Sequence, residues 1–179
     1  MKKFLLLIIV LALISGFFYY KNSRSENLKI NTPAGTNFKP DPSSATFDFD
    51  DLGKVTLSNG QSDTEDETGV NTETLLLQQR GSGDLNNDNK GDTVVLLAQS
   101  GGGSGVFIYL AAYVSGPVSY KGSNAVFVGD RISPQSVSVS NGIITFKYLD
   151  RKPDEPFAAE PTVPTTKQYV YKNGLIEER

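Results

Sequence analysis

The residues that could carry chemistry lie in one short segment, GDLNNDNKGD, in the middle of the chain. With Asp84 as position 1, oxygen-bearing side chains recur at positions 3, 5 and 9, which are Asn86, Asp88 and Asp92. The backbone carbonyl of Lys90 stands at position 7. Ca²⁺ is a hard cation that takes about six to eight oxygen ligands, and this alternating pattern supplies such ligands from one tight loop. The spacing therefore predicts a calcium site built from these five residues.

Two features separate this loop from an EF-hand, and one alternative stays open. Position 12 is Val95 where an EF-hand has Glu, and position 6 is Asn89 where it has Gly. Asn still tolerates the left-handed backbone that position 6 requires. Asp, Asn and Gly are also the residues that form Asx turns, so a tight turn that holds no ion is the competing interpretation.

Missing residue types exclude several kinds of chemistry. The chain has 179 residues and contains no Cys, no His and no Trp. Disulfides, thiol nucleophiles, Cys-ligated metals and the Ser-His-Asp triad are therefore excluded. The net charge is −3, and beyond the first 20 residues the chain has 15 basic and 20 acidic side chains. An acidic chain of this kind argues against nucleic acid as a partner and is compatible with cations.

An enzyme is the rival function, because carboxylates alone can hydrolyse glycosidic bonds. Such enzymes need two carboxyl groups about 5–9.5 Å apart, one of them with a raised pKa. The candidates are Asp130, Asp150, Asp154 and Glu155. Their spacing selects no pair, so no catalytic residue is predicted.

Two further patterns have alternative interpretations. The segment Gly101–Gly105, GGGSG, could cradle a phosphate, but no helix signal or GK[ST] follows it. A hairpin turn is the preferred interpretation. The tyrosines could form a face for stacking carbohydrate, although their strand-like spacing favours cross-strand packing. They are Tyr109, Tyr113, Tyr120, Tyr148, Tyr169 and Tyr171.

The N-terminal segment predicts the location of the protein. Phe4–Tyr20, FLLLIIVLALISGFFYY, is an uncharged run of 17 residues after Lys2 and Lys3. As a helix it would be roughly 26 Å long, close to the ~30 Å core of a bilayer. We expect a transmembrane anchor at 4–20, a cytoplasmic stub at 1–3, and the remainder outside the cytoplasm. A cleaved secretory signal is the alternative, although no A-x-A cleavage pattern follows the run.

A linker and one β-domain are expected after the anchor. Residues 21–44 are polar and proline-containing, which predicts a disordered linker. Residues 45–179 contain short apolar runs without helical periodicity, and we expect Ser58–Glu73 to be an acidic loop. Asn141-Gly142 and Asn173-Gly174 predict two-residue hairpin turns. The predicted fold is therefore all-β, an antiparallel meander that forms a sandwich or barrel.

Several segments together resemble a family of exported bacterial proteins. They are GDLNNDNKGDTVVLLAQSGGGSG, FIYLAAYV, AVFVGDR and YLDRKPDEP, in this order within Val55–Glu178. Members of that family carry a G-D-L-N-x-D-x-x-x-D loop, a G-G-S-G-[ST]-F turn, an L-G-D-R segment and an R-K-P-x-E-P segment. The loop is also similar to the calcium loops of integrin-type FG-GAP repeats. Val106 departs from the family's Ser or Thr. The resemblance implies export and an intact domain, and it implies no activity.

These patterns together predict one function and one alternative. The predicted protein is a membrane-tethered, extracytoplasmic binding or structural module of a bacterial cell envelope, stabilised by one Ca²⁺. Its expected partners are the membrane, through the N-terminal helix, and an envelope protein or glycan. The alternative is a carboxylate-dependent hydrolase that acts on envelope polysaccharide.

Overall fold

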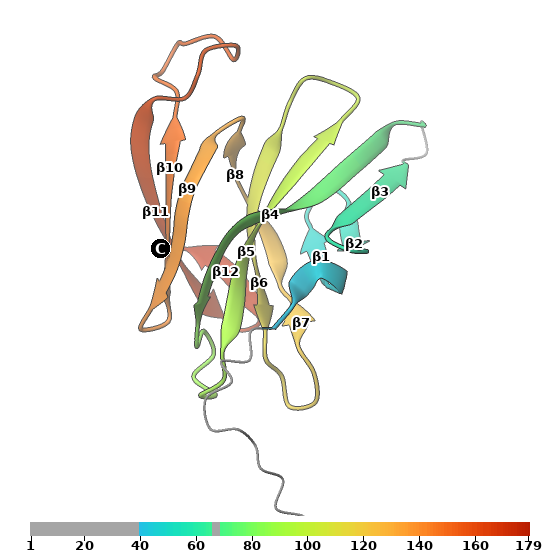
Figure 1. The fold of residues 1–179 in the computed structure, drawn as a ribbon, viewed down its shortest axis with the longest axis vertical. Helices are drawn as coiled ribbons and strands as arrows, with labels where there is room; N and C mark the ends of the chain where they lie inside the picture. Colours follow the sequence, from blue (N-terminus) through green and yellow to red (C-terminus); the bar gives the residue numbers. More distant parts are fainter. Residues whose placement is uncertain (1–39, 66–68) are drawn as a thin grey trace, which may run out of the picture. The chain divides into compact units, whose positions relative to one another are not determined.

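The computed structural model describes residues 40–65 and 69–179, and the described chain is built almost wholly from β-strands (Figure 1). In chain order the elements are the 3₁₀ helix η1 (Pro42–Ser44) and the strands β1 (Thr46–Phe49), β2 (Gly53–Thr56), β3 (Gln61–Glu65), β4 (Asn71–Gly83), β5 (Asp92–Gly101), β6 (Phe107–Val114), β7 (Lys121–Gly122), β8 (Asn124–Asp130), β9 (Ser133–Ser140), β10 (Ile143–Asp150), β11 (Val163–Lys172) and β12 (Leu175–Glu178). The predicted all-β class is confirmed.

The expected membrane segment at 4–20 and the linker up to residue 39 lie outside the described residues. Within the described ranges, no helix is long and apolar enough to span a bilayer. Residues 40–44, the end of the expected linker, are part of the fold. Pro40 and Pro42 are buried, and the hydroxyl of Thr93 donates to the carbonyl of Pro40 at 3.4 Å. The folded unit therefore includes η1.

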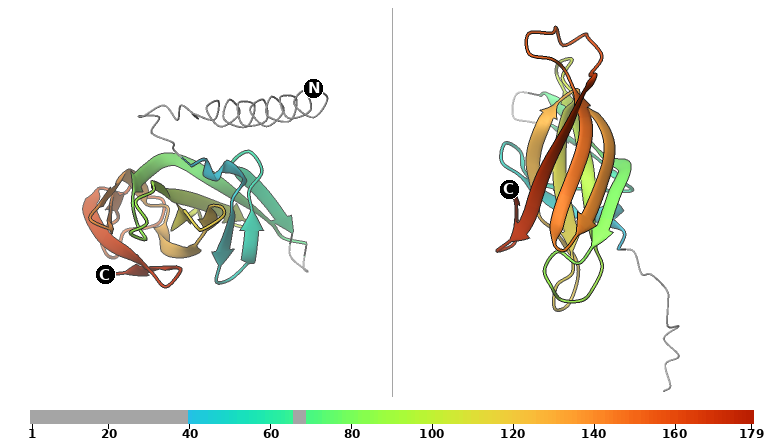
Figure 2. Two further views of the ribbon diagram at one scale, coloured as in Figure 1. Left: turned by 90° about the horizontal axis from the view of Figure 1, so that it is seen from below. Right: turned by 90° about the vertical axis from the view of Figure 1, so that its left-hand side faces the viewer.

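The larger sheet has eight strands and curls into a nearly closed barrel. Its order is β2-β1-β8-β6-β5-β4-β3, with β7 paired to β6. The two ends of this order approach each other at the turn between β2 and β3, where Ser58 bridges Gln61 and the amide of Leu76 donates to the carbonyl of Gly60 at 2.8 Å. The left view in Figure 2 shows this curl from below. Strands β1 and β8 pair in parallel, which departs from the predicted wholly antiparallel meander.

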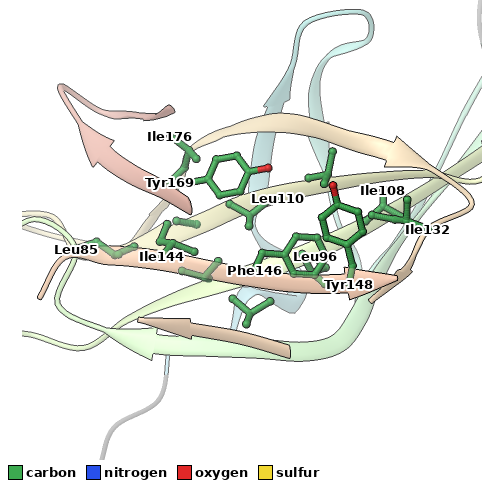
Figure 3. Close-up of a cluster of buried hydrophobic side chains, with 14 of the residues drawn as sticks. Leu85, Leu96, Ile108, Leu110, Ile132, Ile144, Phe146, Tyr148, Tyr169 and Ile176 are labelled. Atoms are coloured by element: carbon green, nitrogen blue, oxygen red, sulfur yellow. The ribbon is translucent and has the colours of Figure 1, made fainter. Parts of the chain in front are cut away.

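The smaller sheet is an antiparallel meander of four strands, β9 to β12, in the order β12-β11-β10-β9. It covers the outer face of the barrel's central strands, and the apolar side chains between the two sheets form the sandwich core (Figure 3). The barrel has its own interior core of ten buried residues, including Phe47, Phe49 and Val55. The prediction was a sandwich or a barrel, and the fold combines the two.

Strand β5 joins the two cores because it is buried on both faces. Val94 and Leu96 point into the sandwich core, whereas Val95 and Leu97 point into the barrel core, and all four side chains are fully buried. Successive side chains of a strand point to opposite faces, so a continuous run of apolar residues suits a strand with a core on each side.

The two sheets meet closely at both sides of the sandwich. On one side, Gly81 and Gly83 of β4 face Val137 and Val139 of β9, and a Cβ atom at Gly83 would lie only 2.6 Å from Val139 Cγ1. On the other side, the side-chain amide of Asn124 in β8 bonds the backbone of Ile176 in β12, accepting at 2.7 Å and donating at 3.1 Å. This amide reproduces the hydrogen bonding of a neighbouring strand, so it links the sheets without a continuous ladder.

Both predicted Asn-Gly hairpin turns are confirmed. Asn141 and Gly142 have φ values of 51° and 73°, and Asn173 and Gly174 have 53° and 89°. These positive values are what a two-residue turn between antiparallel strands requires. Asn59-Gly60 forms a third turn of the same kind, between β2 and β3, with a φ of 53° at Asn59.

The expected acidic loop at Ser58–Glu73 is wrong. Within the described part of this range, residues 59–65 form the Asn59-Gly60 turn and all of β3, and residues 71–73 begin β4. Strand β3 is an edge strand whose residues are exposed or half-buried, so its sequence QSDTE has no apolar positions for a pattern to reveal. Backbone pairing from Gln61↔Leu75 to Glu65↔Asn71 holds it instead.

Candidate functional site

The Asp/Asn loop, residues 84–91, connects β4 to β5. These two strands are antiparallel, and their register pairs Gly83 with Asp92. The two ends of the loop therefore lie side by side. Asn87 and Asn89 have φ values of 61° and 63°, which places both in the left-handed region. The predicted tolerance of Asn89 for this conformation is confirmed.

Side-chain oxygens inside the loop accept hydrogen bonds from its own backbone. Asp84 accepts from the amide of Asn89 at 2.8 Å and from that of Asp88 at 3.2 Å. Asn86 Oδ1 accepts from the amide of Asp88 at 3.1 Å, and Asp88 Oδ1 accepts from that of Lys90 at 2.9 Å. The contacts of Asn86 and Asp88, each two residues along the chain, are Asx turns, and the four hydrogen bonds together hold the loop in a compact form.

Asp92 has a different environment, because its side chain is fully buried. Its two oxygens accept hydrogen bonds from the amides of Leu85 and Ser115, each at 2.8 Å. Asp92 takes part in none of the ion pairs formed by the described residues. A buried carboxylate is costly unless hydrogen bonds and a cation compensate for the lost water, and here the described chain supplies only the hydrogen bonds.

Ser115, just after β6, is a residue of the site that the sequence analysis missed. Its hydroxyl donates to Asp88 Oδ2 at 2.6 Å, and its carbonyl accepts from Asn86 Nδ2 at 2.8 Å. The hydrogen bond from Ser115 is the main cause that lowers the pKa of Asp88, and partial desolvation opposes it. The register pairs Thr93 with Tyr113, so the end of β6 lies beside the start of β5. A predicted hairpin between β5 and β6 was the one sequence signal that could have placed Ser115 beside the loop.

The donor chemistry of the loop fits calcium, but its carboxylates are not gathered around one point. All the candidate side-chain ligands of the metal are oxygen atoms. An oxygen that accepts one hydrogen bond keeps a second lone pair that can bind a cation. Among the described residues, however, no three Asp or Glu side chains lie together as a metal-binding group. Lys90 Nζ also lies 3.6 Å from Asp88 Oδ2, where it competes with a cation. Calcium would have to draw the side chains of Asp84, Asp88 and Asp92 together.

Two of the four carboxylates considered for hydrolysis have shifted pKa values, in the direction opposite to that of a general acid. Hydrogen bonding from Arg131, whose Nη2 lies 2.7 Å from Asp130 Oδ2, lowers the pKa of Asp130. A hydrogen bond from the amide of Lys152, at 3.0 Å, lowers the pKa of Glu155. A general acid needs a raised pKa, and the contacts of both side chains act in the opposite direction.

The other two hydrolase candidates lie where β10 ends and the following loop begins. Asp150 Oδ1 accepts from the amide of Arg151 at 2.8 Å, and Asp154 has a φ of 72° and is exposed. The guanidinium of Arg151 donates to the carbonyls of Ala159, Asp130 and Arg131 at 2.7–3.2 Å. The contacts of Arg151 with backbone carbonyls therefore hold this loop in place, which is a structural role.

Three tyrosines are buried and three are half-buried, and one of the half-buried ones, Tyr171, packs against the sandwich core. Tyr109, Tyr148 and Tyr169 are buried in the cores, as expected for packing residues. Tyr113 and Tyr120 are half-buried and contact each other with tilted rings, whose centroids lie 5.3 Å apart. The predicted hairpin turn at Gly101–Gly105 is also confirmed, since this segment joins the antiparallel strands β5 and β6.

An open pocket lies next to the Asp/Asn loop. It has a volume of about 360 Å³, and its lining includes Lys54, Tyr113, Tyr120 and Lys121. The hydroxyl of Tyr120 donates to the carbonyl of Gly91 at 3.0 Å, so one residue belongs to both the pocket and the loop's surroundings. The sequence analysis considered the tyrosines but neither lysine.

No protein-family model, curated protein or solved structure matches this chain. The geometry described above therefore carries the functional argument.

Proposed function

We propose that this protein is a membrane-tethered, extracytoplasmic binding or structural module of a bacterial cell envelope, stabilised by one Ca²⁺ in the Asp/Asn loop. The tether and the location rest on the apolar segment Phe4–Tyr20 and on the resemblance to exported proteins. The single observation that carries the calcium proposal is Asp92, a fully buried carboxylate without an ion-pair partner among the described residues.

Calcium would supply the positive charge that the described chain does not place beside Asp92. Its ligands would be side-chain oxygens of Asp84, Asn86, Asp88 and Asp92 and the carbonyl of Lys90. The three carboxylates would offset the charge of the ion, but they must first move together, which costs free energy. We therefore expect the modest Kd of extracellular modules, about 10⁻⁴ to 10⁻³ M.

The experiment is a thermal melt of the full chain in mild detergent, with Ca²⁺ or with a chelator. At about 1 mM Ca²⁺, such a Kd raises the free energy of unfolding by roughly 0.4–1.4 kcal/mol. Asp88→Ala should abolish this increase, because Asp88 is at the middle of the loop. Asp63→Ala on the exposed edge strand β3 is the matched control and should keep it. An unchanged melting temperature in Ca²⁺ for the wild type would show that the loop is only a turn.

The tether needs a separate measurement. After a carbonate wash of bacterial membranes, full-length protein should stay in the pellet. Recovery of a soluble form that begins near Glu26 would show instead that the N-terminal segment is cleaved.

A further inference from the structure

The pocket beside β1, β6 and β7 has an unusual charge for this protein. The whole chain has a net charge of −3, yet the pocket lining contains two lysines and no carboxylate. Its residues are Ser44, Ala45, Thr46, Lys54, Tyr113, Tyr120, Lys121 and Gly122. Two other hollows of the described surface each include an aspartate, Asp63 in one and Asp51 in the other. Of these three hollows, the pocket with the lysines is therefore the best suited to an anion.

The two lysines are not committed to ion pairs. Lys54 and Lys121 are exposed, and neither takes part in an ion pair among the residues that the structure describes. Asp48 lies opposite Lys54 in the register of β1 and β2, but the two side chains form no ion pair within 4.0 Å. Both ammonium groups are thus available to a ligand in the pocket.

Aromatic rings and hydroxyls provide the rest of the lining. Tyr113 and Tyr120 lie with their ring planes 31° apart, and the hydrogen bond from Tyr120 to Gly91 fixes the second ring against the Asp/Asn loop. Thr46, a lining residue, shares a 2.8 Å hydroxyl–hydroxyl hydrogen bond with Thr56. A ligand in this pocket meets apolar ring surface and several polar groups at the same time.

Closely packed backbone forms one part of the pocket lining, at Gly122 of β7. A Cβ atom at Gly122 would overlap the carbonyl oxygen of Thr46 and approach the ring of Phe47, so only glycine lets β7 lie this close to β1. The pocket volume of about 360 Å³ is at the lower end of the usual range for small-molecule sites. A site of this size suits one or two rings of a ligand, with the remainder in solvent.

We propose that this pocket binds an acidic saccharide, with a sugar ring against Tyr113 and Tyr120 and its carboxylate between Lys54 and Lys121. A bare inorganic anion would use the lysines but gain nothing from the rings, whereas a neutral sugar would use the rings but not the lysines. The lining combines both features, and this favours a ligand that has both. The inference deepens the proposed function, on which it rests, by naming the ligand class of the binding module.

The test is isothermal titration of the full chain in mild detergent with a hyaluronan tetrasaccharide, which alternates uronic acid with an uncharged sugar. Chitotetraose, of the same length but without carboxylates, is the neutral probe, and tripolyphosphate is the anion without a ring. We expect hyaluronan to bind more tightly than either. The double variant Lys54→Gln/Lys121→Gln should weaken its binding by about tenfold, as expected for two exposed charge contacts. Tyr113→Leu should weaken both saccharides.

Matched controls make the result decisive. Lys147→Gln removes an exposed lysine from β10, in the other sheet, and should leave the affinity unchanged. Three results would each overturn the proposal: no hyaluronan binding at about 10 mM, equal binding of tripolyphosphate, or an equal loss in Lys147→Gln. The calcium proposal is read separately, from the melting shift of the Asp88→Ala variant. A failure of saccharide binding with an intact calcium shift would therefore reject the pocket alone.

Discussion

The hydroxyl of Tyr169 is a buried polar group without a hydrogen-bond partner among the described residues. Its side chain is fully buried in the sandwich core, close to Ile176 (Figure 3). An unsatisfied buried hydroxyl costs free energy, whereas Phe fills nearly the same space without that cost. We expect Tyr169→Phe to raise the free energy of unfolding by about 1 kcal/mol. Denaturant unfolding at pH 8 measures this, with the half-buried Tyr171→Phe as the control.

The same residue contributes to alkaline unfolding. Burial raises the pKa of Tyr169 well above its ordinary value of 10.0, so the unfolded chain loses this proton first. The stabilisation is complete below pH 10 and is lost as the pH rises towards the folded pKa. Tyr169→Phe should therefore lose less stability between pH 8 and pH 11 than the wild type. A residual loss should persist, because burial also raises the pKa of Tyr109 to about 12. Equal pH dependence in both proteins would contradict the assignment.

Among the elements, the contact between β4 and β9 depends on glycine. A methyl group at Gly83 would lie 2.6 Å from Val139 Cγ1 and 2.8 Å from its Cβ, and the latter atom cannot rotate away. We expect Gly83→Ala to lower the free energy of unfolding by about 1–3 kcal/mol, the usual cost of overpacking. Gly103→Ala, in an open turn with no atom closer than 3.9 Å, should be nearly neutral.

A second substitution tests the cause. If overpacking against Val139 is responsible, the double variant Gly83→Ala/Val139→Ala should be more stable than the sum of the two single effects predicts. Strict additivity would show that Gly83 matters for its backbone conformation and not for the space it leaves.

At this scale the sequence predicted the elements that depend on neighbouring residues. It missed those that depend on contacts between residues far apart in the chain. The Asn-Gly turns and the strands beside them follow from residues that are adjacent in the chain. Strand β3 was missed because an exposed edge strand needs no apolar residue, and backbone pairing with β4 suffices. At the candidate site the oxygen pattern from Asp84 to Asp92 was visible, but Ser115 was not. Its contact with Asp88 spans 27 residues and depends on how β5 and β6 pair.

In the molecule as a whole, the two cores share β5, so neither should unfold alone. Leu96 fills the sandwich core and Leu97 the barrel core, and both are fully buried. We expect Leu96→Ala and Leu97→Ala each to lower the free energy of unfolding by about 2–5 kcal/mol. Each variant should keep a single transition that coincides by tyrosine fluorescence and far-UV circular dichroism. A second transition in Leu97→Ala alone would show that the barrel is an independent unit.

The parallel pairing of β1 with β8 has a consequence for how the chain acquires its fold. The register pairs Asp48 with Asn124 and Phe49 with Ala125. Strand β1 therefore cannot pair with β8 until a much later part of the chain has been synthesised. Hairpins such as β4–β5 and β9–β10 need only short loops to close and can form early. Contacts between residues so distant in sequence pay a larger entropy of loop closure and slow folding. Phe47 and Phe49 are then exposed while the barrel is still open, and its completion is the step at which these two rings leave the solvent.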